Sequence, residues 1–468
     1  SKHNMKMYKS KGWLIAMLIL AGFGDAGAQT SKVAASRPNI IIIMTDQQTA
    51  DAMSNAGNKD LHTPAMDVLA ANGTRFTRAY CAQPLCTPSR SAIFSGKMPH
   101  ETGFTGNTPE KDGQWPDSVL MMGKIFKAGG YKTGYVGKWH LPVPVTKVAQ
   151  HGFETIENTG MGDYTDAVTP SQCANFNKKN KDNPFLLVAS FLNPHDICEW
   201  ARGDNLKMDV LDAAPDTAFC PKLPANWPIP AFEPAIVREQ QKVNPRTYPS
   251  VGWNESQWRK YRWAYNRLVE KVDNYMAMVL GSLKKYGIED NTIIIFTSDH
   301  GDGYAAHEWN QKQILYEEAA RIPFIISKIG QWKARTDDQL VCNGIDIIPT
   351  ICGFAGIAKP VGLKGLDLSK RIANPSVKLR DTLVIETDFA DNELLLGIKG
   401  RAVITKDFKY IVYDKGEIRE QLFDLEKDAG EMDNLAVKPA YKKKLNEMRA
   451  YLKLWCKQHQ DSFYALKK

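Results

Sequence analysis

Residues 39–47 read NIIIIMTDQ, and this stretch decides the fold of the chain. A short, unbroken apolar run that ends in polar residues is typical of a strand buried on both faces of a parallel sheet. A helix is predicted next over Thr63–Asn72, because Thr63 can cap it, Pro64 suits its first position and Gly73 can end it. A strand followed by a helix is the repeating unit of α/β domains.

Four further apolar runs of the same kind lie along the chain, at Tyr131–Val136, Phe185–Phe191, Thr292–Thr297 and Pro323–Ser327. Apolar residues also recur at helical spacing over Asn254–Tyr286, which predicts one long amphipathic helix. We therefore predict an α/β fold over residues 37–364, in which a large mixed, mostly parallel sheet is flanked by helices.

The pattern changes after Lys364. Three short segments separated by turns predict an antiparallel sheet, at Leu383–Thr387, Ala402–Thr405 and Tyr410–Tyr413. A final amphipathic helix is indicated by apolar residues at Leu445, Met448, Leu452 and Trp455. Residues 365–468 are therefore predicted to form a smaller α+β subdomain, with an antiparallel sheet and a helix.

A secretory signal peptide is predicted over residues 1–28. Lys6, Lys9 and Lys11 precede the apolar run Trp13–Ala21, and Ala26–Ala28 supplies an A-x-A cleavage site before Gln29. The alternative is a membrane anchor, but spanning a bilayer takes about 20 apolar residues, more than this run provides. We therefore expect an exported chain, periplasmic or secreted, without a stable membrane anchor.

The net charge is mildly basic, at +8 for 468 residues. Four lysines and one aspartate lie in residues 1–29, so the leader carries +3 and the remainder +5. The longest basic block noted is Lys442–Lys444, on a helix face expected to be solvated, so no nucleic-acid role is predicted. The surplus instead suits an anionic substrate.

The spacing of the eight cysteines indicates neither a structural zinc ribbon nor a disulfide framework. None of them forms a C-x-x-C pair, which argues against a structural zinc site. Export permits disulfides, but a chain of this length can bury a stable core without them. Free, buried thiols are therefore expected for most of these residues.

Chemically active side chains follow the predicted strands at their carboxyl ends, where open α/β sheets place their sites. In chain order they are Asp46 and Gln47, Lys138 and His140, His195, and Asp299 and His300. Because the carboxyl ends of parallel strands meet at one edge, we expect these side chains to converge.

Asp46, Gln47 and Asp299 offer hard oxygen ligands, and His300 adds a nitrogen. Such an oxygen-rich set favours Ca²⁺, with Mg²⁺ as a second candidate, and the histidine keeps a transition metal open. The alternative for each aspartate is a helix cap that follows a strand. Two such pairs, Asp46-Gln47 and Asp299-His300, end two apolar strands, which favours one divalent cation over two caps.

The segment LCTPSRSA, from Leu85 to Ala92, predicts an anion site. Pro88 favours an extended residue before it and a helix start at its own position, so Cys86 lies at a helix N-terminus. Unpaired N–H groups there attract anions, and Arg90 adds a guanidinium fork one turn later. Alternatively, Cys86 is only a buried structural cysteine.

These residues resemble a known family. Cys86–Arg90 is similar to the C-x-P-S-R signature of type I, formylglycine-dependent sulfatases, members of the alkaline phosphatase superfamily. The resemblance continues, in the family's order, through Arg37–Asn39, Asp46-Gln47, Gly134–His140, Asn193–His195, Asp299–Gly301, Lys312–Pro323, Leu422–Leu425 and Asp433–Leu435. Several matched segments over most of the chain make a specific signal.

The resemblance implies a mechanism and its residues. Cys86 would be oxidised to Cα-formylglycine by a formylglycine-generating or sulfatase-maturating enzyme, and would then also ligate the metal. One hydroxyl of the aldehyde hydrate would attack sulfur, and the second would later expel sulfate. His195 and Lys312 would serve the leaving alcohol, and His140 would act as the base. Arg90, Lys138 and Lys312 would hold charge on the sulfuryl oxygens.

One position departs from the usual pattern of the family. Many members carry Asp-Asp where this chain has Asp46-Gln47. The carbonyl oxygen of Gln47 can still bind a cation, as in a recognised subgroup, but it brings one negative charge less. The resemblance therefore implies a complete ligand set of somewhat lower charge.

The resemblance implies a sulfated carbohydrate as substrate, from a glycosaminoglycan, a mucin or an algal glycan. His307 is the candidate substrate-binding residue, and Trp200 or Trp309 could stack on a sugar. His100 and His151 are expected to be structural or surface histidines. Two alternatives stay open at this point: a phosphatase or phosphodiesterase of the same superfamily, and a non-catalytic protein that binds sulfated glycans.

Overall fold

The strand predicted from NIIIIMTDQ is β1 (Asn39–Asp46), in the middle of an eight-stranded sheet. The computed structural model describes residues 37–108, 114–160, 165–389 and 397–464, so the predicted signal peptide lies outside the described residues. The strand order is β4-β3-β5-β1-β6-β7-β2-β8. The other strands are β2 (Gly73–Tyr80), β3 (Lys132–Gly137), β4 (Thr155–Glu157), β5 (Phe185–Pro194), β6 (Thr292–Ser298), β7 (Phe324–Ser327) and β8 (Arg335–Cys342).

The sheet is mixed and mostly parallel, as predicted. β1 pairs in parallel with β5 and β6, and β3 pairs in parallel with β4 and β5. β7 is reversed, because it runs antiparallel to both β6 and β2. β2 and β8 again pair in parallel.

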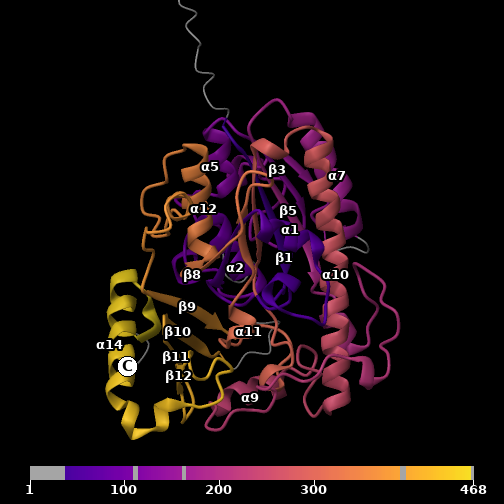
Figure 1. Cartoon of the computed structure of the whole chain (residues 1–468). Coiled ribbons are helices and arrows are strands. Elements are labelled where there is room, and N and C mark those ends of the chain that lie inside the picture. Colours follow the sequence, from indigo (N-terminus) through magenta and orange to yellow (C-terminus); the bar gives the residue numbers. More distant parts are fainter. Residues whose placement is uncertain (1–36, 109–113, 161–164, 390–396, 465–468) are drawn as a thin grey trace, which may run out of the picture. The chain divides into compact units, whose positions relative to one another are not determined.

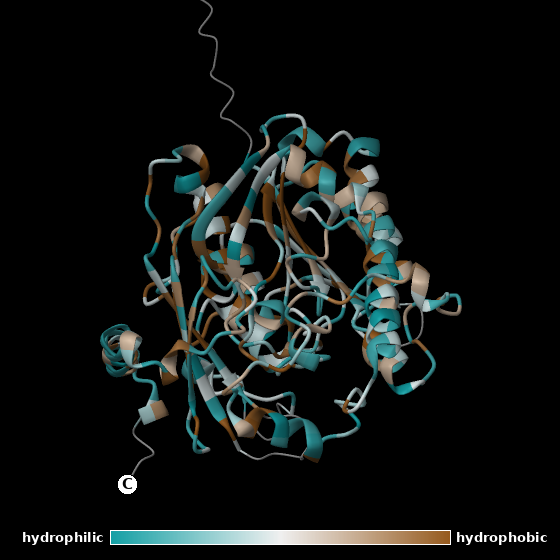
Figure 2. Ribbon diagram, turned by 60° about the horizontal axis from the view of Figure 1, so that its bottom comes forward, coloured by the Kyte–Doolittle hydropathy of each residue, from teal (hydrophilic) through white to brown (hydrophobic). Residues whose placement is uncertain are grey.

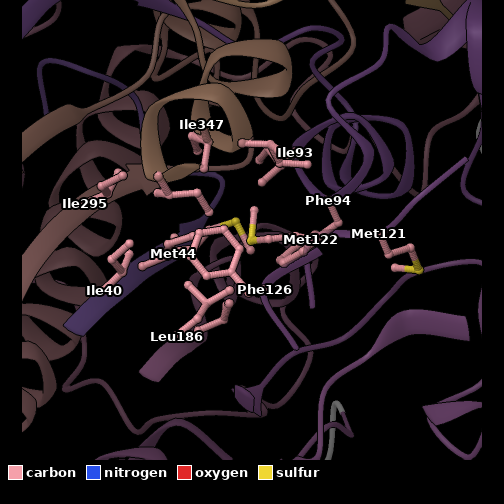
Figure 3. Packing of buried hydrophobic residues seen from close by; sticks show 14 of the residues in the cluster. Ile40, Met44, Ile93, Phe94, Met121, Met122, Phe126, Leu186, Ile295 and Ile347 are labelled. Carbon is pink, nitrogen blue, oxygen red and sulfur yellow. The ribbon is translucent and has the colours of Figure 1, made fainter. Parts of the chain in front are cut away.

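Successive side chains of β1 enter two different cores, as expected for a strand covered on both faces. Ile40, Ile42 and Met44 belong to one hydrophobic cluster, whereas Ile41 and Ile43 belong to the other. Figure 3 shows Ile40 and Met44 packed with side chains of the neighbouring strands and of the helices above them. All eight residues of β1 are buried, so the strand is enclosed on both faces.

Helices cover each face of the sheet (Figure 1). One face packs against α1 (Pro64–Ala71), α7 (Thr165–Asn180) and α10 (Glu255–Lys285), and the other against α2 (Cys86–Ser95), α5 (Met122–Ala128) and α12 (Asn343–Ala355). Figure 2 shows the hydrophobic residues concentrated in the enclosed strands and hydrophilic residues on the outward sides of the helices.

The predicted long helix is confirmed as α10, with Asn254 at its N-cap accepting from the Gln257 backbone N–H at 3.0 Å. The described part of the chain also contains α3 (Pro99–Thr102), α6 (Val148–His151), α8 (Ile197–Arg202), α9 (Ala235–Val243), α11 (Glu317–Ala320), α13 (Ser369–Ala373) and α14 (Lys442–His459). Short 3₁₀ segments lie at Ser54–Ala56, Thr217–Phe219, Glu289–Asn291, Ala306–Glu308, Leu435–Val437, Pro439–Tyr441 and Ser462–Tyr464.

A second sheet of four antiparallel strands follows, in the order β12-β11-β10-β9. Its strands are β9 (Thr382–Asp388), β10 (Lys399–Thr405), β11 (Phe408–Tyr413) and β12 (Glu420–Asp424). Val384 and Val403 pack on α14, whereas Ile385 and Ile404 face a core shared with the large sheet. The predicted antiparallel sheet and terminal helix are confirmed, with one strand more than expected.

Hydrogen bonds tie this second sheet to the loops of the first. The Glu386 backbone N–H donates to the Ala82 carbonyl at 2.8 Å, and the Thr387 hydroxyl donates to the Gln313 carbonyl at 2.5 Å. The described residues from Arg37 onward accordingly belong to one compact unit. The boundary after Lys364 lies between α12 and α13 and stays a prediction.

All eight cysteines are free and buried, as expected. Two histidines expected to be structural or surface residues make internal contacts: His151 bonds to the Val145 carbonyl at 3.0 Å, and His100 lies against Glu386. Among the described residues, no helix combines the length and the apolar character that crossing a bilayer requires.

His100 links α3 to the C-terminal sheet. Its Nδ1 faces Glu386 of β9, and its Nε2 donates to the His459 carbonyl at 3.0 Å. Nearby, Arg401 of β10 binds Asp461 through two contacts of 2.6 and 2.9 Å. Burial opposes protonation of His100, but the Glu386 carboxylate outweighs it and raises the pKa of the imidazole.

Replacing a buried residue of α10 should destabilise the protein far more than replacing an exposed one on the same helix. Leu268 is fully buried, and Leu268→Ala should lower the free energy of unfolding by about 2–5 kcal/mol, since it leaves a cavity. Met278 is 57% exposed, so Met278→Ala should change it by less than about 0.5 kcal/mol. Urea unfolding followed by circular dichroism measures both, and equal losses would contradict this packing.

The stability supplied by His100 should fall as the pH rises. A group with a raised folded pKa stabilises fully below the unfolded value of about 6.5 and loses this effect as the pH passes the folded pKa. The difference in unfolding free energy between the unsubstituted protein and His100→Gln should therefore shrink from about pH 5 to about pH 9.

His151→Gln serves as the comparison, because burial lowers the pKa of His151 and the corresponding difference should grow with pH. Urea titrations at several pH values measure both slopes. A His100→Gln difference that does not depend on pH would rule out the proposed ion pair.

Candidate active site

The carboxyl ends of four strands meet at one rim of the large sheet. Thr45 of β1 lies opposite Ser298 of β6, and Asp46 lies opposite Pro194 of β5. At the next strand, Gly137 of β3 pairs with Ser190 of β5. The residues that follow these strand ends are therefore brought together, as the sequence predicts.

Cys86 is the first residue of α2 and is 1% exposed. Its Sγ lies 3.2 Å from Lys312 Nζ, 3.3 Å from His300 Nε2 and 3.9 Å from Asp46 Oδ1. Burial and Asp46 oppose ionisation of the thiol, but Lys138, Lys312 and His300 outweigh them and hold its pKa well below the ordinary value. The site thus favours a negatively charged group at this position.

Arg90, one turn further along α2, is fully buried and bridges two carboxylates. Its Nη2 donates to Asp46 Oδ2 at 3.0 Å, and its Nε donates to Asp299 Oδ2 at 2.9 Å. Its Nη1 donates to Ser190 Oγ at 3.0 Å and to the Lys138 carbonyl at 3.1 Å. These contacts show Arg90 positioning the carboxylates, a role that the sequence did not reveal.

Lys138, the residue directly after β3, forms an ion pair with Asp46. Burial would raise the pKa of Asp46, but the charges of Lys138, His195 and Arg90 hold it well below its usual range. Burial and the charge of Asp46 raise the pKa of Asp299 to about 6. Two carboxylates so close together would be relieved by a divalent cation.

The donor set fits such a cation. One ligand atom from each of Asp46, Cys86, Asp299 and His300 lies within 4.8 Å of the others. The Nδ1 of His300 faces the Gly301 carbonyl at 2.8 Å, so it must carry the proton, and Nε2 is left to bind a metal. Asp299 and Cys86 outweigh burial and raise the pKa of His300, so the same field would attract a cation.

Gln47 adds an amide oxygen at the same rim. Its Oε1 lies 3.3 Å from Lys312 Nζ. Its backbone is left-handed, with φ 70°, and is held by the N–H bond to Asp299 Oδ1 at 3.1 Å and by the Tyr265 hydroxyl, which donates to its carbonyl at 2.6 Å. A non-glycine residue in this conformation stores strain that its surroundings must compensate.

Two histidines line the same pocket. His140 also has a left-handed backbone, with φ 46°; burial lowers its pKa against a partly opposing contact with Cys86. Burial, Lys312 and Lys138 lower the pKa of His195 well below the ordinary value. The Nδ1 atoms of both rings are buried without a hydrogen-bond partner in the described part of the chain, and Nδ1 of His195 is 3.8 Å from Glu199 Oε2.

The loop that carries Lys312 is irregular. Gln311 and Gln313 on either side are left-handed, with φ 73° and 78°, and the Trp309 indole N–H donates to the Lys312 carbonyl at 3.1 Å. The loop is also bound to a distant segment, because the Gln313 backbone N–H donates to the Pro84 carbonyl at 2.8 Å. These hydrogen bonds, rather than a helix or a strand, direct Lys312 toward Cys86.

The structure corrects the expectation for His307. Its side chain does not line an opening: it is 1% exposed, its ring lies 3.9 Å from the ring of Tyr316, and its Nε2 is 2.9 Å from the Gly430 carbonyl. Trp309 is fully buried as well, so it packs in the core and is closed to a sugar. The sequence suggested His307 because a polar residue lies close to a site motif, and that pattern does not show whether the side chain is buried.

Sequence reasoning also missed supporting residues. Ser89 donates its hydroxyl to the Asp299 carbonyl at 2.5 Å, and Asp302 accepts from Gln47 Nε2 at 2.8 Å. Ser89 lies inside the C-x-P-S-R segment, and Asp302 comes two residues after His300. Their positions next to predicted site residues could have indicated a supporting role. Their hydrogen-bond partners could not be predicted, because these lie far away in the sequence.

Comparisons with known proteins agree with this geometry. A family model described as Sulfatase matches residues 38–357, and one described as N-sulphoglucosamine sulphohydrolase, C-terminal, matches residues 305–458. A delta 4,5-hexuronate-2-O-sulfatase of Bacteroides thetaiotaomicron is 31% identical over 449 residues, covering 93% of this chain and 92% of that protein. An ulvan-active sulfatase of Formosa agariphila is 31% identical over 454 residues, covering 92% and 84%.

A solved structure described as a 2-O GAG sulfatase has a TM-score of 0.82 and 29% identity, covering 92% of this chain and 94% of that one. The Sulfatase match spans most of the α/β domain and includes every predicted catalytic and metal-binding residue. Of the activities left open by the sequence, the comparisons support hydrolysis of sulfate esters. The chain belongs to the sulfatase family of the alkaline phosphatase superfamily and is a sulfuric ester hydrolase.

Proposed function

We propose that this chain is an exported glycan sulfatase that uses Cα-formylglycine, derived from Cys86, and one Ca²⁺ ion. The observation that carries this proposal is the placement of Cys86 Sγ, buried at the start of α2 within 3.2 Å of Lys312 Nζ and 3.3 Å of His300 Nε2. A nucleophile at this point would face candidate metal ligands on one side and fixed cations on another.

Asp46, Gln47, Asp299 and His300 would hold the cation, together with the group derived from Cys86. Oxygen donors dominate this set, which supports Ca²⁺, with Mg²⁺ as the second candidate. When bound, the cation supplies positive charge that polarises a sulfate ester and favours an ionised nucleophile. The formylglycine derived from Cys86 would supply, as its hydrate, the nucleophilic hydroxyl and the hydroxyl whose proton is lost when sulfate is released.

The remaining roles follow from position and charge. Lys312 lies beside Cys86, and its ammonium group would bind a sulfuryl oxygen and donate to the leaving oxygen. The neutral ring of His195 would offer a second donor there, backed by Glu199. His140, neutral and within reach of Cys86, would accept the proton when sulfate is released.

The proposed substrate is a sulfated carbohydrate. Relatives at 31% identity are described as acting on a hexuronate 2-O-sulfate and on ulvan, which supports a sulfated glycan for this chain too. The predicted signal peptide over residues 1–28 supports export to the periplasm or secretion. A formylglycine-generating or sulfatase-maturating enzyme would be the required partner.

Protein from a host that makes formylglycine should show the modification at Cys86. The peptide that contains Cys86 should be about 18 Da lighter than the unmodified one, as expected when a thiol becomes an aldehyde. Sulfate release from a panel of defined sulfated mono- and disaccharides should fall by at least about 1,000-fold in Cys86→Ala, because the nucleophile is removed.

Cys456→Ala is the matched control, since Cys456 is a buried free cysteine of α14 and its loss should leave turnover intact. Mass spectrometry and ion chromatography of sulfate measure the two effects. The proposal fails if the protein and its Cys86→Ala variant cleave a phosphate diester equally well and release no sulfate.

Removing the cation should abolish turnover reversibly. Dialysis against a chelator should stop sulfate release, and added Ca²⁺ should restore it, because Asp46 and Asp299 are then neutralised again. Asp299→Asn should weaken Ca²⁺ binding by about 10-fold or more. Asp337 lies outside the site in an ion pair with Arg371, so Asp337→Asn should leave Ca²⁺ binding unchanged. Calorimetry measures the affinity, and full turnover in metal-free protein would refute the assignment.

A further inference from the structure

Asp302 is a fully buried carboxylate that neither the motifs nor the proposed mechanism uses. Its Oδ2 accepts from Gln47 Nε2 at 2.8 Å and from the Gln311 backbone N–H at 3.1 Å. Its Oδ1 accepts from the Tyr304 backbone N–H at 2.7 Å, and the Tyr261 hydroxyl lies 2.8 Å from both oxygens. Backbone N–H groups can only donate, so each oxygen of Asp302 acts as an acceptor.

This carboxylate decides which way the amide of Gln47 faces. The two ends of an amide side chain have the same shape, so only their partners distinguish them. Cys198 cannot distinguish the two ends, because its sulfur lies 3.4 Å from Nε2 and 3.5 Å from Oε1 and a thiol can donate or accept. An acceptor at Asp302 requires Nε2 on its side, which turns Oε1 toward Lys312.

The same oxygen also fixes the loop that presents Lys312. Gln311 precedes Lys312 directly and has a left-handed backbone with φ 73°. Its N–H bond to Asp302 Oδ2 holds this conformation. One buried carboxylate therefore holds both the amide ligand that follows β1 and the start of the catalytic lysine loop.

We propose that Asp302 is a positioning residue that aims the Gln47 carbonyl oxygen at the cation and aligns Lys312 with Cys86. This inference rests on the proposed function, because it assigns a purpose to the cation site. It also accounts for glutamine at position 47. An aspartate there would place a second carboxylate close to Asp302, and two buried like charges repel.

The donor and acceptor at this contact can be exchanged, which provides the test. In Asp302→Asn, one acceptor oxygen becomes an NH₂ group. Turned toward Gln47, this group can donate to the Gln47 oxygen and let Nε2 face the cation, but it no longer accepts from the Gln311 backbone N–H. In Gln47→Asp, two carboxylates face each other. In the double variant, the amide introduced at position 302 donates to the carboxylate introduced at position 47, and an oxygen again faces the cation.

Calorimetric titration of the whole mature protein with CaCl₂ gives the dissociation constants. Each single variant should bind Ca²⁺ about 10-fold more weakly or worse. Asp302→Asn lets the wrong end of the Gln47 amide face the cation, and in Gln47→Asp repulsion by Asp302 turns the new carboxylate out of position, which outweighs the charge it adds. The double variant should return to within about threefold of the unsubstituted protein, a non-additivity that a merely structural role would not produce. Additive losses, or no loss in either single variant, would overturn the proposal.

Asp273→Asn is the matched control. Asp273 is a buried carboxylate of α10 that accepts from the backbone N–H groups of Ala65 and Met66 at 3.0 and 2.9 Å. Its replacement should lower thermal stability and leave the Ca²⁺ dissociation constant unchanged. An equal loss of Ca²⁺ affinity in this control would show that general destabilisation explains the Asp302 effect, and would overturn the proposal.

The unsubstituted protein separates this inference from the proposed function. If it binds neither Ca²⁺ nor Mg²⁺, the cation assignment is wrong and the role of Asp302 falls with it. If it binds Ca²⁺ and the four proteins of the cycle behave additively, only the role of Asp302 is refuted. Circular dichroism of each variant without metal establishes that the fold is retained.

Discussion

A buried guanidinium that bridges Asp46 and Asp299 is the interaction on which the rest of the active site depends. Arg90 belongs to α2, whereas the two carboxylates end β1 and follow β6, so this one side chain joins a helix to two strands. Cys86 lies one turn earlier on the same helix and is placed by the same contact. Breaking such a buried pair costs about 3–5 kcal/mol, a large share of the stability of a typical domain.

The C-terminal sheet completes the site from the other side. Thr387 holds the Gln313 carbonyl, and Glu386 holds the loop that precedes Cys86. Both bonds come from β9, so the second sheet supports the nucleophile and the Lys312 loop together. The two sheets also share a hydrophobic core, which fixes β9 against these loops.

The central strands and the site motifs could be predicted from the sequence because their signals are local. β1 and β6 are unbroken apolar runs that lead into acidic residues. β2 and β8 were missed because charged residues such as Arg75 and Asp338 interrupt their patterns. The reversed direction of β7, the burial of His307 and the inward bonds of Arg90 depend on contacts between distant segments, which no local pattern encodes.

Several residues at the site occupy a backbone region that favours glycine. Gln47, His140, Gln311 and Gln313 have φ values of 70°, 46°, 73° and 78°. Each costs on the order of 1–3 kcal/mol, which the surrounding bonds must offset. A glycine would relax the backbone at these positions but would delete the side chain that the chemistry or its support needs. At these positions selection for thermal stability would favour glycine, whereas selection for turnover favours the present side chains. Heat-tolerant relatives should therefore gain their stability elsewhere in the fold.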